Sequence, residues 1–372
     1  MPLSFRLAAF YFAFFAHAGA YVAYFPLYLS WRGLSAIDIA WVLALPPLAR
    51  IFAPAAWGWL ADARSAHRAI VAFACAATAV AFAALPFVDR IALLIGAMSV
   101  LSAGALPLVE AITMGSLAGR HGAYGPIRVW GSVGFIAVVL AGGLWLDYGS
   151  VSVLPGAIAV FMLAALAVAL ALPPTAKHAA LPPAEPLRFA PGAAALLGAA
   201  FCMAVAHGAL YAFLSLHLER EGYSGTAIGA LWTLGVAAEI LVFLYLPQLF
   251  RRHALSTILV GALACGVVRF LALGWGASAL WLVLLAQSLH GATFGAFHAA
   301  SVAAVHRVFP AHAHGRGQTL FSSLGYGAGG AAGIVLSGWA WEAGAAPLAF
   351  SVSALAALAG MAFALRLKRA GL

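Results

Sequence analysis

Long apolar runs, separated by short polar segments, follow one another along the whole chain. A helix needs about 20 apolar residues to cross a bilayer. The runs are apolar on every face, whereas the strands of a membrane barrel alternate between apolar and polar residues. The pattern therefore predicts an all-α membrane protein with twelve transmembrane helices, at 5–30, 37–61, 69–88, 91–118, 127–146, 151–172, 191–218, 225–249, 254–274, 278–308, 317–341 and 345–365.

The composition of the chain excludes a soluble protein. Of the 372 residues, 65% are hydrophobic and 8% are charged, and the mean hydropathy is +1.03. Soluble domains carry roughly 25% charged residues. Little chain remains outside the twelve runs, so we expect no sizeable extramembrane domain for catalysis, nucleotide binding or nucleic-acid binding. We also expect no cofactor.

The distribution of positive charge predicts the orientation of the chain. With the N-terminus in the cytoplasm, fourteen of the 19 Lys and Arg residues fall in cytoplasmic segments and three fall outside. Positive residues favour cytoplasmic loops, and an even number of helices returns the C-terminus to the cytoplasm. We expect an integral protein of a bacterial inner membrane, with both termini cytoplasmic.

One proline-rich segment divides the chain into two halves. Residues 173–190 hold five prolines and form the longest polar stretch, which predicts a cytoplasmic linker between six-helix bundles at 1–172 and 191–372. Residues 33–60 can be laid on 222–249 without a gap, with seven identities in 28 positions. We therefore expect two six-helix pseudo-repeats.

Four charged side chains lie well inside the predicted helices, away from their ends: Arg50, Glu110, Glu239 and Arg269. The repeat alignment sets Arg50 opposite Glu239, each about 15 Å before the cytoplasmic end of its helix. A charge at such a depth is costly unless it faces a partner or water. Two interpretations stay open: these residues form static ion pairs between helices, or some of them line a solute path and titrate.

Other polar side chains in the runs also allow two interpretations. Arg128 lies one turn into the fifth run. It is either an interface residue whose guanidinium reaches the lipid headgroups or a residue with a role in transport. His290 and His298 are eight residues apart, about 80° beyond two helical turns, so we do not expect them on one narrow face. Each is either a proton-handling group or a buried histidine bonded to a carbonyl. No metal-ligand spacing appears, so we expect no metal site.

The loop after the second run resembles the major facilitator signature G-x-L-x-D-R-x-G-R-K. Gly58, Leu60 and Asp62 match it, whereas Ala63 and Ser65 stand where that signature has Arg and Gly. Within that superfamily the stretches RVWGSVGF, WTLGVAAEI, LHGATFGAFH and GRGQTLFSSLGYG resemble the phenylpropionate-permease family. This resemblance covers almost the whole chain and implies a transporter with two six-helix halves.

A more distant similarity to lactose permease concerns single residues. It implies that Glu110, Arg128 and Phe135 correspond to the sugar-binding acid, the arginine and the stacking aromatic residue of that family. Arg269 and His290 match its arginine of helix 9 and its histidine of helix 10. We therefore expect Glu110, Arg128, Phe135 and His290 to bind substrate.

The proton-coupling group has to lie elsewhere than in lactose permease. The proton-carrying acid of that family, one turn after the histidine, is Thr293 here. A threonine cannot carry a proton at physiological pH, so we assign proton coupling to Glu239, with Arg269 as its charge partner and Arg50 as a second candidate.

These observations predict a secondary active transporter that takes up a small organic solute, such as an aromatic carboxylate, with protons by alternating access. A sugar or nucleoside proton symporter is the alternative, and an exporter ranks below both. A non-transporting sensor is disfavoured by the charges in the helices, and an intramembrane enzyme by the lack of a nucleophile–base pair. The partners of the predicted transporter would be the solute, protons and lipid, with no nucleic acid, and we expect a monomer.

Overall fold

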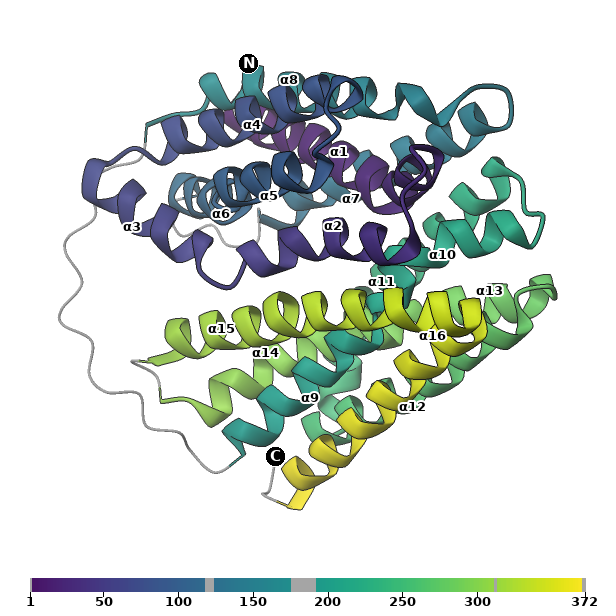
Figure 1. Ribbon diagram of the computed structural model, residues 1–372. Helices are drawn as coiled ribbons and strands as arrows, with labels where there is room; N and C mark the ends of the chain where they lie inside the picture. The colour runs from purple at the N-terminus through teal and green to yellow at the C-terminus, as the bar shows by residue number, and fades with distance from the viewer. Residues whose placement is uncertain (1, 118–123, 175–191, 311–312, 370–372) are drawn as a thin grey trace. The chain divides into compact units, whose positions relative to one another are not determined.

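The computed structural model describes residues 2–117, 124–174, 192–310 and 313–369. Every regular element in these ranges is a helix (Figure 1). The helices are α1 Leu3–Trp31, α2 Ala36–Ala49, α3 Ala53–Arg64, α4 His67–Ala84, α5 Ile91–Ser102, α6 Ala105–Ser116, α7 Tyr124–Leu146, α8 Leu154–Leu170, α9 Ala193–Ala206, α10 Gly208–Arg220, α11 Gly225–Arg252, α12 Leu255–Gly276, α13 Leu280–Ser288, α14 Phe297–Val308, α15 His314–Ser322 and α16 Gly330–Arg369, with two π-helices, η4 Gly291–Ala296 and η6 Ser323–Gly329.

Eleven helical stretches of the described chain are long and apolar enough to cross a membrane. The last of them, His314–Leu367, has 54 residues, or about 80 Å at 1.5 Å per residue. The backbone leaves helical geometry inside it at Gly344 and Ala345. This stretch is therefore more than twice as long as the hydrocarbon core, which is about 30 Å thick.

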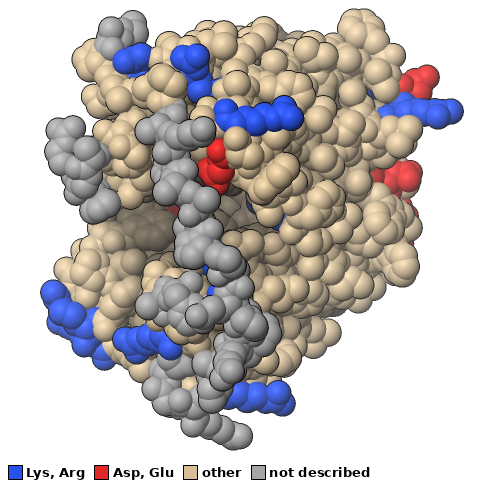
Figure 2. Space-filling model, turned by 90° about the vertical axis from the view of Figure 1, so that its left-hand side faces the viewer, with Lys and Arg blue, Asp and Glu red and all other residues tan. Residues whose placement is uncertain are grey.

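The surface visible in Figure 2 carries few charged side chains. Figure 2 looks onto one end of the helices, and uncharged residues cover most of the surface visible there. Lys and Arg side chains form several small groups on this face, and Asp and Glu are fewer. A water-soluble domain would need a far higher share of charged side chains.

Several of the predicted helices are broken in their middle. The second run is split into α2 and α3 around Arg50, after Pro46 and Pro47. Proline has no N–H to donate and interrupts the hydrogen bonds of a helix. The seventh run is split at His207, which ends α9 and begins α10. The sequence predicts both runs as continuous helices, and the structure corrects this.

The described helices group into two compact units by their contacts. Unit 1 comprises Met1–Gly33, Phe52–Ala184 and Ser224–Gly229; unit 2 comprises Leu34–Ile51, Glu185–Tyr223 and Ala230–Leu372. The helix α2 therefore packs with unit 2, and the first turn of α11 packs with unit 1. The boundaries predicted from sequence, 1–172 and 191–372, remain a prediction, and the predicted linker falls mostly on residues 175–191, outside the described ranges.

Close helix crossings at glycines organise each unit. In unit 1, α7 crosses α1 at Gly134, where a Cβ atom would lie 2.2 Å from the carbonyl oxygen of Phe12. In unit 2, a Cβ atom on Gly208 would lie 2.1 Å from the backbone of Gly333 in α16. No larger residue fits at such distances, so these glycines fix which helices lie backbone to backbone.

The aligned segments of the two halves share their local geometry. Gly33 and Gly222, which begin the aligned segments, have φ of 81° and 86°. Two residues later the hydroxyls of Ser35 and Ser224 accept hydrogen bonds from backbone N–H groups three positions on. A glycine in the left-handed region followed by a serine cap is thus used twice.

An acid from another helix also caps each of these starts. Glu342 of α16 accepts from the N–H of Ala36 at 3.1 Å, and Asp147 after α7 accepts from Gly225 and Thr226. The Thr226 hydroxyl contributes most to holding the pKa of Asp147 below its ordinary value. Because that pKa is lowered, the cap of α11 is intact at neutral pH and is lost only as the pH falls through the acid range.

Candidate functional site

Glu110 of α6 and Arg128 of α7 meet in unit 1. The Arg128 Nε lies 3.9 Å from a Glu110 carboxylate oxygen, and the two side chains are 29% and 39% exposed. The Tyr124 hydroxyl donates to the same carboxylate at 3.5 Å. The guanidinium also lies over the rings of Phe15, at 4.0 Å, and Tyr11, at 5.4 Å. We call these five residues the Glu110–Arg128 cluster.

A second glycine of α7 makes room for this cluster. A Cβ atom on Gly131 would lie 2.8 Å from Nη1 of Arg128 and 2.9 Å from the ring of Phe15. The guanidinium can therefore stack on Phe15 only because position 131 carries no side chain. Cation–π contacts of this kind hold an arginine in place while part of its donor edge stays accessible.

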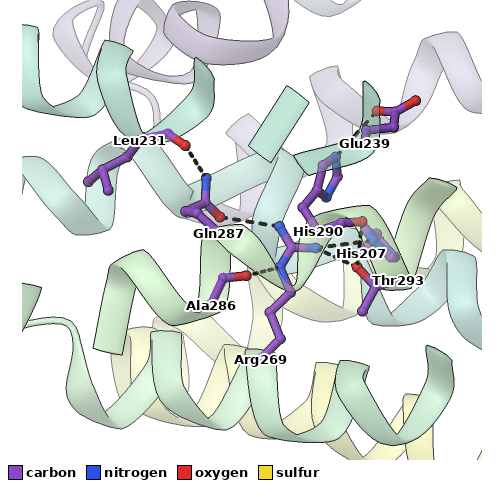
Figure 3. Close-up of polar contacts among 8 residues, drawn as sticks. All are labelled: His207, Leu231, Glu239, Arg269, Ala286, Gln287, His290 and Thr293. Carbon is purple, nitrogen blue, oxygen red and sulfur yellow. Dashed lines mark hydrogen bonds and ion pairs between the residues drawn. The ribbon is translucent and has the colours of Figure 1, made fainter. Parts of the chain in front are cut away.

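Arg269 of α12 is the centre of a second cluster, in unit 2 (Figure 3). Its side chain is buried, with 1% of its surface exposed. The guanidinium donates to the Ala286 carbonyl at 2.9 Å, to Thr293 Oγ1 at 2.9 Å and to Gln287 Oε1 at 3.2 Å. These acceptors are all neutral, so a full positive charge is buried among dipoles. Together with His207 they form the Arg269 cluster.

His207 completes the ring of acceptors from the break between α9 and α10. Its Nδ1 lies 2.9 Å from the Met203 carbonyl oxygen, to which it donates. Its Nε2 is then the acceptor that faces Nη1 of Arg269, at 3.4 Å. The same carbonyl also accepts from the backbone N–H of His207 at 3.2 Å. Local chain geometry thus fixes the orientation of the imidazole towards the arginine.

Glu239 of α11 lies next to His290, at the start of η4. The His290 Nε2 is 3.9 Å from a Glu239 carboxylate oxygen, and the Glu239 side chain is 21% exposed. Two glycines of η4 permit the contact: a Cβ atom on Gly291 would lie 2.5 Å from the Ala238 carbonyl oxygen, and one on Gly295 would lie 3.3 Å from Glu239 Cγ.

The expected pairing of Glu239 with Arg269 differs from the geometry found. Among the described residues, the ion pair of Glu239 that the distances define is with His290, while the hydrogen bonds of Arg269 go to neutral acceptors. The groups that Arg269 contacts on α13 and η4 are neutral and polar.

The π-helix corrects our expectation for His290 and His298. Phe294 stacks on both rings, with centroid distances of 5.5 and 6.3 Å. A π-helical turn takes more residues than an α-helical one, so positions 290, 294 and 298 come into one column. His298 then reaches Tyr326 of η6, whose hydroxyl oxygen lies 2.7 Å from Nδ1.

The remaining predicted residues lie apart from these contacts. Phe135 of α7 is half-buried, about 10 Å along the helix from Arg128. Gly58 faces open space, Leu60 packs on the core of unit 1, and Asp62 pairs with His67 at 3.1 Å.

Ser65, which stands where the signature has Gly, has a φ of 50°. The structure thus explains why a glycine suits that position, because a left-handed backbone costs other residues energy.

The sequence patterns did not single out His207 and Gln287. His207 and Gln287 each interrupt an otherwise apolar run, and this is the signal that could have found them. Tyr11 gives no such signal, because it is one of many aromatic residues in α1 and only the crossing with α7 sets it beside Arg128.

Comparison with known sequences gives a consistent result. A model of the MFS_1-like family matches residues 4–352. A probable 3-phenylpropionic acid transporter of Escherichia coli (strain K12) is 39% identical over 97 residues, 26% of this chain and 25% of that protein. A maltose permease of Geobacillus stearothermophilus is 26% identical over 92% of this chain and 90% of its own.

Comparison with solved structures agrees on the fold. A mutant form of the nucleoside transporter NupG superimposes with a TM-score of 0.86 over 99% of both chains, at 18% sequence identity. The proteins found by sequence and by structure are membrane transporters rather than enzymes.

Thr293→Val tests whether Arg269 depends on neutral acceptors. The change keeps the shape of the side chain and removes an acceptor from a buried cation, so unfolding in detergent should need about 1.5–3 kcal/mol less free energy.

Thr78→Val is the matched control, because Thr78 is equally buried and its hydroxyl donates only to the Ala74 carbonyl in its own helix. Equal losses of stability in the two variants would contradict a special role for Thr293.

Proposed function

The chain belongs to the MFS_1-like family of major facilitator transporters, and we propose that it takes up a small organic solute together with protons by alternating access. The Glu110–Arg128 cluster would bind the solute, and Glu239 would carry the proton. The observation that supports this division most directly is that the hydrogen bonds of Arg269 go to neutral groups. Glu239 could therefore gain and lose a proton without leaving the Arg269 guanidinium unpaired.

We propose an aromatic carboxylate as the solute. The partly exposed Arg128 guanidinium can grip a carboxylate with two parallel hydrogen bonds, and the rings of Phe15 and Tyr11 lie beside it. Arg50, Arg128 and Arg269 lie inside the spans together with the two acids Glu110 and Glu239, and an excess of positive charge favours an anion. The similarity to a probable 3-phenylpropionic acid transporter supports the same class.

A sugar or a nucleoside is the second candidate. The Glu110 carboxylate, which already accepts from Tyr124, could accept from solute hydroxyl groups, and Phe135 lies further along α7. The similarities to a maltose permease and to a nucleoside transporter support this alternative. An exporter ranks below both.

We extend the proposal to the architecture. The 54-residue stretch with a break at Gly344 and Ala345 would cross the membrane twice, which gives twelve crossings in two six-helix halves. The excess of Lys and Arg in the segments predicted to be cytoplasmic supports cytoplasmic termini in a bacterial inner membrane. We expect the protein to act as a monomer.

Arg128→Lys tests the solute site. Lysine keeps the charge but offers a point donor instead of a planar fork, so affinity for 3-phenylpropionate should fall at least about tenfold, the equivalent of about 1.4 kcal/mol. Binding is measured by calorimetry on the purified protein.

Arg366→Lys is the control for this change, because Arg366 also lies over an aromatic ring but near the end of α16. Unchanged binding in Arg128→Lys would make Arg128 an interface residue. Loss of binding in both variants would point to a general effect of lysine on the fold.

Glu239→Gln tests the proton site. The amide cannot titrate, so accumulation of solute driven by an imposed pH gradient should be lost, while solute binding and exchange across equilibrated membranes persist. Both are measured in proteoliposomes.

Glu219→Gln, an exposed acid at the end of α10, serves as the matched control and should retain accumulation. Survival of gradient-driven accumulation in Glu239→Gln would exclude Glu239 as the carrier. Loss of folding instead of coupling would favour a static ion pair.

A further inference from the structure

Two arginines from different helices of unit 1 meet at the end of α8, which packs against both α1 and α4 (Figure 1). The Arg6 guanidinium of α1 donates through Nη1 to the Ala171 carbonyl oxygen. The Arg68 guanidinium of α4 donates through Nη1 to the Leu172 carbonyl oxygen at 3.3 Å. Carbonyl groups at the C-terminus of a helix carry the negative end of its dipole. The end of α8 therefore holds two cationic side chains at adjacent residues.

Neither guanidinium is neutralised by an acid of the described chain. Asp62, the acid nearest to Arg68 in the sequence, pairs with His67 at 3.1 Å. The ion pairs among the described residues include neither Arg6 nor Arg68, and the Nε of Arg6 is buried there without a hydrogen-bond partner. A guanidinium has five N–H donors, so one carbonyl bond each leaves further donors for an anion.

The start of α1 adds positive potential at the same place. This helix begins after Pro2 with no side-chain cap and no acid in its first turn. The first N–H groups of a helix have no partner inside it and carry the positive end of its dipole. Side chains tilt towards the N-terminus of their helix, so Arg6 lies beside these groups. Helix end and arginines together favour an anion.

An apolar cavity lies between α1 and α8, with Arg6 in its wall. Its volume is about 550 Å³, and the other lining residues are Phe5, Ala9, Ala167, Val168 and Ala171. Phe5 is 53% exposed. Cavities that take small ligands measure roughly 300–1,000 Å³. A ligand that fills this cavity and also reaches the guanidinium has to join an anionic group to an apolar chain.

We propose that an anionic phospholipid binds to unit 1, with its phosphate on Arg6 and Arg68 and an acyl chain in the cavity between α1 and α8. Arginine can grip a phosphate with two parallel hydrogen bonds. In the orientation proposed above, this end faces the cytoplasm, where anionic lipids give the leaflet its negative potential. A free phosphate would use the arginines but not the apolar walls. The inference depends neither on the solute nor on proton coupling.

Thermal unfolding of the purified, delipidated protein tests the site. Phosphatidylglycerol should raise the melting temperature more than phosphatidylcholine with the same acyl chains, because a ligand of the folded state stabilises that state. In the double variant Arg6→Gln/Arg68→Gln the apparent affinity for phosphatidylglycerol should fall about tenfold or more. The readout is the difference between the two lipids, so a lower melting temperature of the variant itself does not affect it.

Arg251→Gln/Arg252→Gln is the matched control. These two arginines are adjacent and exposed at the end of α11, in unit 2, and their replacement changes the net charge equally. The control should keep the preference for phosphatidylglycerol. An equal loss of this preference in both double variants would overturn the inference, since the effect would then follow net charge alone. Absence of the preference in the unaltered protein would overturn it as well.

Ala167→Phe keeps the inference testable if the double arginine variant does not fold. The added ring fills the cavity and leaves both arginines in place, so the affinity for phosphatidylglycerol should fall. Ala83→Phe, the same change at an exposed position near the other end of α4, should keep it. Unchanged phosphatidylglycerol binding in Ala167→Phe, or equal stabilisation by inorganic phosphate alone, would show an anion site without an acyl chain and would overturn the inference.

Discussion

The burial of Arg269 among neutral acceptors is the constraint on which the chemistry of unit 2 depends. A guanidinium that is 1% exposed has to be satisfied by hydrogen bonds, because an unpaired buried charge destabilises the fold strongly. Thr293, Gln287 and His207 supply these bonds from three separate elements. Among the described residues these bonds of Arg269 go to neutral groups, and Glu239 lies beside His290.

Glycines bring both clusters together. Gly131 and Gly134 let α7 lie against α1 so that Arg128 stacks on Phe15, and Gly291 lets η4 lie against α11 so that His290 reaches Glu239. At such crossings the backbones meet at distances that exclude a Cβ atom, a packing mode that membrane helices favour. The charged residues supply the chemistry, while the glycines determine which of them become neighbours.

The sequence predicted the helical class and the apolar runs, because hydropathy carries that information locally. It could not predict the break at His207 or the π-helical column from His290 to His298, since both depend on contacts between distant segments. The pairing of Glu239 with Arg269 was expected from resemblance to a family with an acid near position 293. With a threonine at position 293, the arginine has other partners, and only the three-dimensional arrangement reveals which groups these are.

Proton movement during solute entry tests the coupled mechanism most directly. The purified protein is reconstituted into vesicles that contain a pH-sensitive dye, and 3-phenylpropionate, maltose or a nucleoside is added outside without an imposed pH gradient. Protein-free vesicles measure the passive entry of the acid. We predict that the transported solute acidifies the interior faster with the protein than without it. Solute entry through the protein with no protein-dependent proton movement would contradict proton coupling.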